Sequence, residues 1–152
     1  MIVDVEKLRA GARLDVAFTK TYRIPEEYGL IGNSADARVT GHIAEEAGRY
    51  VFEAEAEASF RAECSRCLTP VRAGAAFKFR SVFATEPEKE DYDDVYPVAD
   101  GKADLSAAAV SNLLIEIPVK FLCSKDCKGL CPVCGANLND DPGHGHSPPQ
   151  DA

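Results

Sequence analysis

The sequence lacks the long apolar run that a membrane-spanning helix needs. No stretch approaches the roughly 18 consecutive apolar residues of such a helix. The chain starts Met-Ile-Val-Asp-Val-Glu, without the basic start and the apolar stretch of a secretion signal. We therefore expect a cytoplasmic protein, in whose reducing surroundings cysteines rarely end as disulfides.

The sequence also has little positive charge. Its 17 Lys and Arg stand against 25 Asp and Glu, which leaves a net charge of −8. This balance argues against nucleic-acid binding over the whole surface, which needs clustered Lys and Arg. The chain has no internal repeat and no glycine-rich loop for a phosphate. No Glu stands beside a His in the pattern that gives a catalytic zinc ion its base, so we expect a protein that is not an enzyme.

The charges are unevenly distributed along the chain. Residues 61–80 contain one acid and five basic residues, namely Arg61, Arg66, Arg72, Lys78 and Arg80. Residues 86–104 contain two lysines and eight acids, namely Glu86, Glu88, Glu90, Asp91, Asp93, Asp94, Asp100 and Asp104. Both runs can be solvated faces. The alternative is a local basic face that contacts phosphate, with an acidic loop that attracts a basic protein.

Three segments, 14–18, 52–62 and 71–79, alternate apolar and polar residues. This period of two predicts half-buried strands of an antiparallel sheet. A further strand around Val39 and Ile43 would turn at Gly48 into 52–62. The Glu-Ala repeat of 52–62 is also good helix-forming material. We predict a strand there because the alternation continues to the next cysteine and a matching segment follows a short turn.

One helix is predicted over 104–117. Apolar residues recur there at four-residue spacing, Asp104 can cap its first amides, and Pro118 ends it. Residues 84–103 show little periodicity and are typical of a mobile loop. The fold class is therefore α+β, with an antiparallel β-sheet or partly open barrel packed with one main helix.

The expected organisation has three parts. Residues 1–118 form the sheet domain with its helix, and 119–139 form a cysteine-rich zinc-binding segment. Residues 140–152 contain several Pro and Gly and are expected to be a disordered tail, unless their two histidines are bound.

Six cysteines carry the strongest signal in the chain. Two Cys-x-x-Cys pairs are present, at 64–67 and 131–134, and Cys123 and Cys127 place four cysteines within 123–134. Scattered cysteines are usually small core residues, but 123–134 is polar and loop-like, with no core to enter. The spacing lets a tight turn aim two sulfurs at one ion. We therefore predict a structural metal ion, zinc.

Three ligand sets are compatible with the spacing. We favour Cys123, Cys127, Cys131 and Cys134 as one local site, since it closes the shortest loops at the least entropy cost. The second set joins Cys64 and Cys67 to Cys131 and Cys134. The third fills two sites, with His144 or His146 completing the second one. The remaining histidine, His42, is expected to be a plain surface residue.

Three motifs together resemble those of the YceD family. They are Cys64-Ser65-Arg66-Cys67-Leu68, Asp104-Leu105 opening a helix that ends in Ile117-Pro118, and Cys127-Lys128-Gly129-Leu130-Cys131-Pro132-Val133-Cys134-Gly135-Ala136-Asn137-Leu138-Asn139. The resemblance covers about residues 38–139. Members of this family, from bacteria and plastids, are described as large-subunit ribosomal RNA accumulation proteins. They have been catalogued as candidate metal-binding and nucleic-acid-binding proteins.

The resemblance implies a factor that supports accumulation or assembly of the large-subunit ribosomal RNA. Its partner would be that RNA or a ribosomal or assembly protein. Candidate contact residues are Arg61, Arg66, Arg72, Arg80, Lys125 and Lys128. Some relatives carry further cysteines where this chain has His144 and His146, and others lack most of the cluster, so a scaffold role for the metal fits best. The alternative function is a rubredoxin-like or thiol-based redox protein.

Overall fold

The computed structural model describes residues 1–86 and 95–146. Its centre is a five-stranded sheet in the order β2-β3-β4-β5-β6. The strands are β2 (Arg13–Arg23), β3 (Leu30–Glu46), β4 (Arg49–Glu63), β5 (Pro70–Ala84) and β6 (Val95–Pro97). The first four strands run antiparallel to one another, and β6 pairs parallel with β5.

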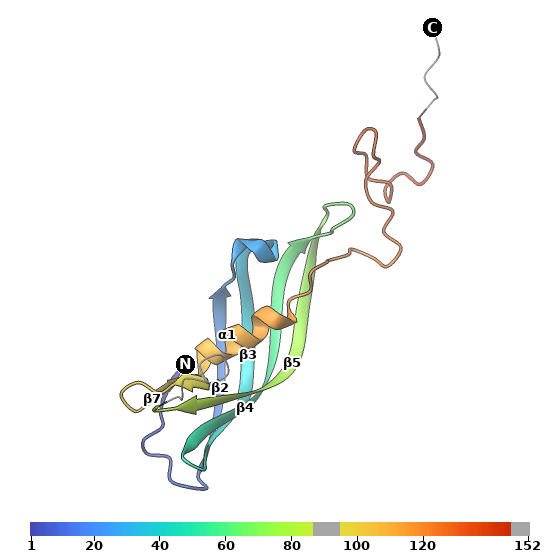
Figure 1. Cartoon of the computed structure of the whole chain (residues 1–152). Helices are drawn as coiled ribbons and strands as arrows, with labels where there is room; N and C mark the ends of the chain where they lie inside the picture. The colour runs from blue at the N-terminus through green and yellow to red at the C-terminus, as the bar shows by residue number, and fades with distance from the viewer. Residues whose placement is uncertain (87–94, 147–152) are drawn as a thin grey trace.

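Three short elements and one helix complete the fold. β1 (Ile2–Asp4) pairs with β7 (Lys102–Asp104), and the 3-10 helix η1 spans Glu26–Tyr28. Helix α1 (Leu105–Glu116) crosses one face of the large sheet (Figure 1). None of the helices in the described ranges has the length and apolar character to cross a membrane.

The predicted fold class is confirmed, since the chain is mainly β-sheet with one main helix. The Glu-Ala repeat is a strand: its alanines, Phe52 and Phe60 are buried, and its glutamates are exposed. The predicted helix cap is also present, because Asp104 Oδ1 accepts a hydrogen bond of 3.0 Å from the Ser106 N–H. The Glu-Ala repeat therefore forms a strand because one face of the strand is buried under α1.

The prediction of a loop over 84–103 is wrong where the structure describes it. Residues 95–97 form β6, and residues 102–104 form β7, which pairs with β1. Strands of three residues are too short to show a period of two. The acids Glu88, Glu90, Asp91, Asp93 and Asp94 lie outside the described residues.

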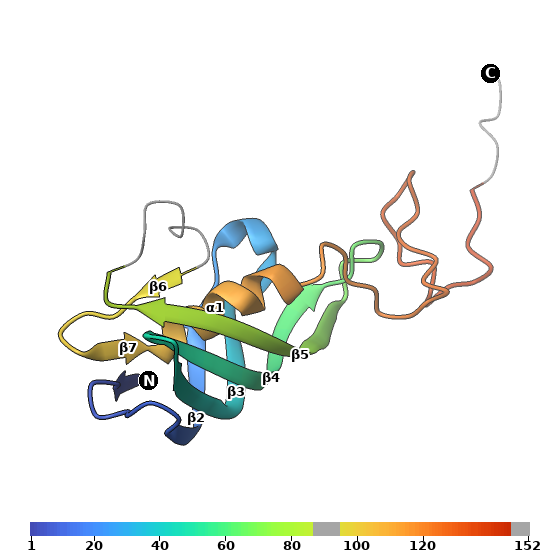
Figure 2. The ribbon, with the colours of Figure 1, turned by 60° about the horizontal axis from the view of Figure 1, so that its bottom comes forward.

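The core continues from the helix toward the tip of the β4–β5 hairpin. Leu105 and Leu113 of α1 are fully buried against the sheet. Beyond the helix, Phe121 packs edge-on against Phe60 of β4, with ring centroids 5.9 Å apart. Figure 2 shows the C-terminal segment leaving the helix along this end of the hairpin. The chain after α1 is thereby fixed to the hairpin tip before it reaches its cysteines.

Gly41 in β3 has no room for a side chain. An added Cβ would overlap the carbonyl oxygen of Glu53 and lie 2.6 Å from the Cα of Ala54. We expect Gly41→Ala to lower the free energy of unfolding by about 1–3 kcal/mol, as overpacking does. Urea denaturation measures this, with Gly143→Ala as control, because only one atom lies within 4 Å of a Cβ there, at 3.9 Å. Equal stabilities of the two variants would contradict the close approach of β3 and β4.

Candidate metal centres

The first Cys-x-x-Cys pair forms the tip of the β4–β5 hairpin. The Leu68 N–H donates to the Cys64 carbonyl at 2.9 Å, and the Cys64 N–H donates to the Thr69 carbonyl at 2.9 Å. This tight turn is attached to the segment after α1: the Ser65 N–H donates to the Phe121 carbonyl at 2.8 Å, and the Phe121 N–H donates to Ser65 Oγ at 3.2 Å. Cys123, two residues further on, is thereby held beside the tip.

Four sulfurs meet at this tip, from Cys64, Cys67, Cys123 and Cys127, which we call the first centre. The Sγ atoms of Cys64 and Cys127 are 3.7 Å apart, and those of Cys67 and Cys123 are 3.5 Å apart. Sulfurs around a tetrahedral zinc ion at about 2.3 Å would lie about 3.8 Å apart. All four are free cysteines, and three are buried. The donor set and its spacing fit a closed structural site.

Hydrogen bonds prepare this centre for thiolates. Burial of Cys64 opposes ionisation, but the backbone N–H groups of Arg66 and Cys123 outweigh it and lower the pKa of its thiol to about 6. Burial likewise opposes ionisation of Cys127, whose pKa is lowered by the Asn139 side chain and a backbone N–H. Hydrogen bonding to neighbouring sulfurs raises the pKa of Cys123 to about 12. Without an ion, the thiols of Cys64 and Cys127 therefore ionise more readily than that of Cys123.

The second centre consists of Cys131, Cys134, His144 and His146. Each histidine presents Nε2: that of His146 lies 3.0 Å from Cys131 Sγ, and that of His144 lies 3.1 Å from Cys134 Sγ. The two Nε2 atoms are 3.2 Å apart. Two thiolates and two imidazoles form a typical tetrahedral zinc set.

Two polar side chains support the centres, and the sequence analysis missed both. Asp141 Oδ2 lies 3.5 Å from Nδ1 of His144, which directs the opposite nitrogen toward the sulfurs. Asn139 Nδ2 donates to Cys127 Sγ at 3.4 Å, and its Oδ1 accepts from the Lys128 N–H at 2.8 Å. An acid three residues before a ligand histidine is the signal that could have indicated Asp141.

The favoured ligand set is corrected by this geometry. Cys123 and Cys127 join the hairpin cysteines, whereas Cys131 and Cys134 join the histidines, so the arrangement is that of the third set. Loop closure within 123–134 was the wrong criterion, because the Phe121 contacts already hold Cys123 at the hairpin. The candidate ligands also extend beyond 119–139 on both sides, and residues 140–146 contain two of them, His144 and His146.

The candidate basic residues fall into three places. Arg61 and Arg72 are directly opposite each other on β4 and β5, about 7 Å along the strands from the hairpin's last pair. Arg66 donates to the Cys127 carbonyl at 2.9 Å. Lys125 and Lys128 are exposed and lie next to Cys123, Cys127 and Cys131 in the sequence. These five residues therefore lie at the hairpin end that carries the cysteines or in the cysteine segment itself.

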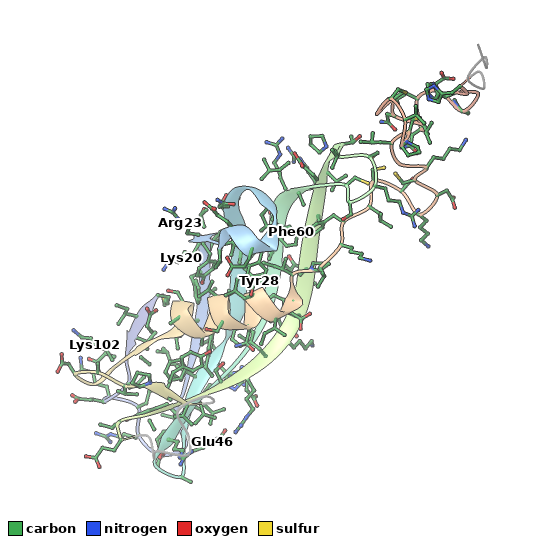
Figure 3. The ribbon with its side chains drawn as sticks, turned by 45° about the horizontal axis from the view of Figure 1, so that its top comes forward. Lys20, Arg23, Tyr28, Glu46, Phe60 and Lys102 are labelled. Atoms are coloured by element: carbon green, nitrogen blue, oxygen red, sulfur yellow. The ribbon has the colours of Figure 1, made fainter. Side chains whose placement is uncertain are left out.

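Arg80 lies elsewhere. It is about 26 Å along β5 from Arg72 and pairs with Glu46 and Glu53 at 3.5 Å each. Figure 3 shows Glu46 at the end of the sheet remote from the sulfurs. The structure therefore separates Arg80 from the other candidate contact residues.

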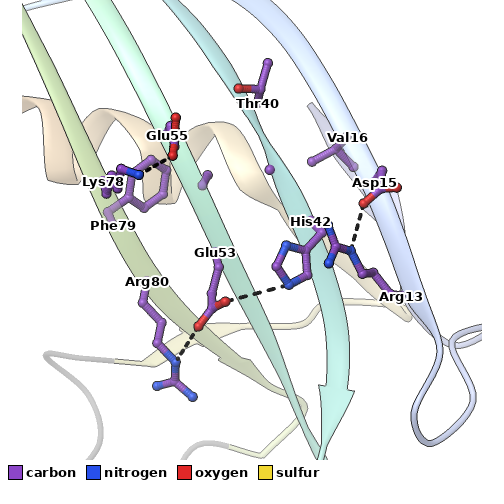
Figure 4. Close-up of a pocket in the computed structure, with 12 residues that line it drawn as sticks. Arg13, Asp15, Val16, Thr40, His42, Glu53, Glu55, Lys78, Phe79 and Arg80 are labelled. Carbon is purple, nitrogen blue, oxygen red and sulfur yellow. Dashed lines mark hydrogen bonds and ion pairs between the residues drawn. The ribbon is translucent and has the colours of Figure 1, made fainter.

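His42 lies at a shallow groove on the sheet face away from α1 (Figure 4). The groove measures about 820 Å³. Its charged side chains are paired with one another: His42 and Arg80 with Glu53, Lys78 with Glu55, and Arg13 with Asp15. His42 is thus part of this network of surface pairs on the open face of the sheet.

Several known proteins are similar to this chain. An uncharacterized protein of Mycobacterium tuberculosis is 38% identical over 88 residues, which are 55% of this chain and 42% of that protein. An uncharacterized protein of Mycobacterium leprae is 38% identical over 89 residues, 55% of this chain and 41% of the relative. The maize chloroplastic large ribosomal RNA subunit accumulation protein YCED homolog 1 is 43% identical over 51 residues, 32% and 17% of the two chains.

The match thus spans about two fifths of the length of the mycobacterial relatives. No solved structure matches this chain. The family model described as large ribosomal RNA subunit accumulation protein YceD matches residues 52–152, from the start of the β4 core to the end of the chain. This match includes the hairpin, helix α1 and both metal centres. The chain belongs to the YceD family.

Proposed function

We propose that the protein is a non-enzymatic cytoplasmic factor that supports accumulation of the large-subunit ribosomal RNA by contacting that RNA directly. The family description and the maize relative's name support the RNA class. The observation that carries direct contact is the pair Arg61–Arg72. Like charges directly opposite on a sheet destabilise it, and neither arginine forms an ion pair within the described residues. A phosphate between the two guanidinium groups would remove that repulsion.

The other charged residues on the exposed face of the β4–β5 hairpin support the same location for the RNA contact. Going along the hairpin from its open end, Glu53 pairs with Arg80 and Glu55 with Lys78. These cations are neutralised by acids on the same face, so they offer little to a phosphate. At the metal end, Arg66, Lys125 and Lys128 add to the arginine pair, and none of these cations has an ion pair within the described residues. Phosphate binding depends on such local clusters and not on net charge.

Both centres are proposed to hold zinc in a structural role. Four protein ligands leave no open position for a substrate or water, which a catalytic zinc site keeps. The ions would fix the basic residues relative to one another, since Arg66 lies between two first-centre ligands in sequence and Lys128 follows another. Metal binding thus shapes the RNA-contacting face without taking part in a reaction.

Crosslinking in cells tests the proposed function. RNA crosslinked to the protein is sequenced, and proteins crosslinked to it are identified. Enrichment of large-subunit ribosomal RNA or its precursor, with contacts mapping to 61–72, is expected. Recovery of a ribosomal or assembly protein without RNA would contradict direct RNA contact and favour a protein partner.

Chelation is expected to loosen the metal end while the sheet stays folded. The core between α1 and the sheet contains no metal ligand, whereas Cys64, Cys67 and Cys127 form a small cluster of their own. Hydrogen exchange with and without chelator measures this. Amides of 64–69 and 121–146 should lose protection, and those in the middle of β3 and β4 should keep it. Loss of protection throughout would mean that the ions hold the whole domain.

A further inference from the structure

The two Cys-x-x-Cys turns have the same backbone geometry. The Leu68 N–H donates to the Cys64 carbonyl, and the Gly135 N–H donates to the Cys131 carbonyl, both at 2.9 Å. In each turn the first cysteine's N–H also donates to the carbonyl of the residue five positions later, Thr69 or Ala136. Leu68 and Gly135 therefore occupy equivalent positions.

Both positions require a left-handed backbone. Gly135 has φ of 76° and Leu68 has φ of 60°. Glycine adopts this conformation without steric cost, whereas a leucine Cβ meets the neighbouring carbonyl. The first turn thus carries a strained residue where the second carries a relaxed one. Residues held in such conformations cluster at functional sites.

Burial of the Leu68 side chain does not compensate for this strain. Leu68 is 56% exposed, and the small apolar cluster around Cys64 and Cys67 is completed by Val71 and Leu130 instead. Leu68 lies in the turn of the hairpin tip, two residues after Arg66, and the Arg61–Arg72 pair lies two residues back along the strands from the hairpin's last pair. An exposed apolar group within positive charge fits a negatively charged partner that offers apolar faces.

We propose that Leu68 is a base-contacting residue: its side chain packs on an unstacked base of single-stranded RNA whose phosphates bind Arg61 and Arg72, an assignment that rests on the proposed function. RNA is the polymer that combines negative charge with apolar planar faces, and loops and bulges display those faces. A duplex stacks its bases out of reach of the leucine. Leu68 therefore selects loops over duplex, whereas the arginines bind both.

The test compares the wild type with Leu68→Gly on two probes, loop-containing fragments of large-subunit ribosomal RNA and blunt duplex RNA of the same length. The variant is expected to bind the loop fragments about fivefold to tenfold more weakly, which corresponds to uncovering about half a leucine side chain. Its duplex affinity should not change. Its melting temperature should stay the same or rise, because glycine relieves the left-handed strain.

Val133→Ser is the matched control, because Val133 is a 74% exposed apolar residue in the second turn. It should leave both affinities unchanged. Absence of RNA binding by the wild type would refute the proposed function itself. With the wild type binding, an unchanged loop affinity of Leu68→Gly, or an equal loss on both probes, would overturn the base contact alone. A melting temperature of Leu68→Gly several degrees below that of the wild type would also overturn the base contact, because Leu68 would then stabilise the fold. The same holds if Leu68→Gly binds RNA normally but loses a protein partner whose binding to the wild type survives ribonuclease treatment.

Discussion

Replacing Cys64 and Cys67 together by serine is expected to remove one of two zinc ions per chain and to detach residues 121–127 from the hairpin tip. A hydroxyl is a far poorer zinc ligand than a thiolate, so two of the four bonds are lost. Structural zinc contributes on the order of 10 kcal/mol to the segments that it orders.

Elemental analysis of the purified protein measures the metal content, and hydrogen exchange measures the detachment. The wild type should contain two zinc ions per chain and be colourless. Iron with a red colour would instead support the rubredoxin-like alternative. One zinc ion in the wild type would contradict the presence of two independent centres.

Cys131→Ser with Cys134→Ser is the matched variant at the second centre. It should also lose one ion, but residues 64–69 and 121–127 should keep their protection because the first centre has no ligand after Cys127. His144→Ala with His146→Ala should behave in the same way. If the histidine variant kept both ions at full occupancy, the second centre would not be the one that the geometry indicates.

Local pattern was sufficient to predict β4, β5 and the helix, but it indicated only 14–18 of β2 and the region around Val39 and Ile43 of β3. β4 and β5 have 15 residues each, and apolar and polar residues alternate along much of both, which is typical of strands with one buried face. β6 and β7 have three residues each, and their pairing depends on partners far away in the chain. No local signal distinguishes such strands from a loop.

The ligand types were predictable, but their grouping was not. Cys-x-x-Cys spacing indicates a metal site, since it depends only on a tight turn. The grouping depends on Phe121, which packs on Phe60 and bonds to Ser65, and thereby brings Cys123 to the hairpin. The position of Arg80 was not predictable for the same reason. Its distance from the metal end follows from the register of β4 and β5, which the sequence positions of the basic residues do not reveal.

Neutralising Arg61 and Arg72 by glutamine is expected to lower the affinity for large-subunit ribosomal RNA by a factor of about 100 or more. A hydrogen bond to a charged group contributes about 1.5–3 kcal/mol, and two such phosphate contacts would be lost. The salt dependence of log K should fall by about 0.7–0.9 for each contact. Binding titrations at several salt concentrations measure both quantities.

Lys78→Gln with Arg80→Gln is the matched control, because it changes the net charge by the same amount on the same strand pair. These two cations are already paired with Glu55 and Glu53, so their loss should change the RNA affinity less than about threefold. Equal losses in the two variants would mean that net charge matters and position does not, which would contradict the proposed contact.

The free energy of unfolding of the Arg61→Gln, Arg72→Gln variant shows whether a loss of RNA affinity comes from a lost contact or from a damaged fold. The Arg61–Arg72 pair places like charges directly opposite each other, which is destabilising in an antiparallel sheet. The glutamine variant should therefore be as stable as the wild type or slightly more stable, while its RNA affinity falls. A bound phosphate that bridges the two arginines would remove this repulsion. If the variant were less stable in urea and bound RNA normally, the arginines would serve the hairpin and the RNA contact would lie elsewhere.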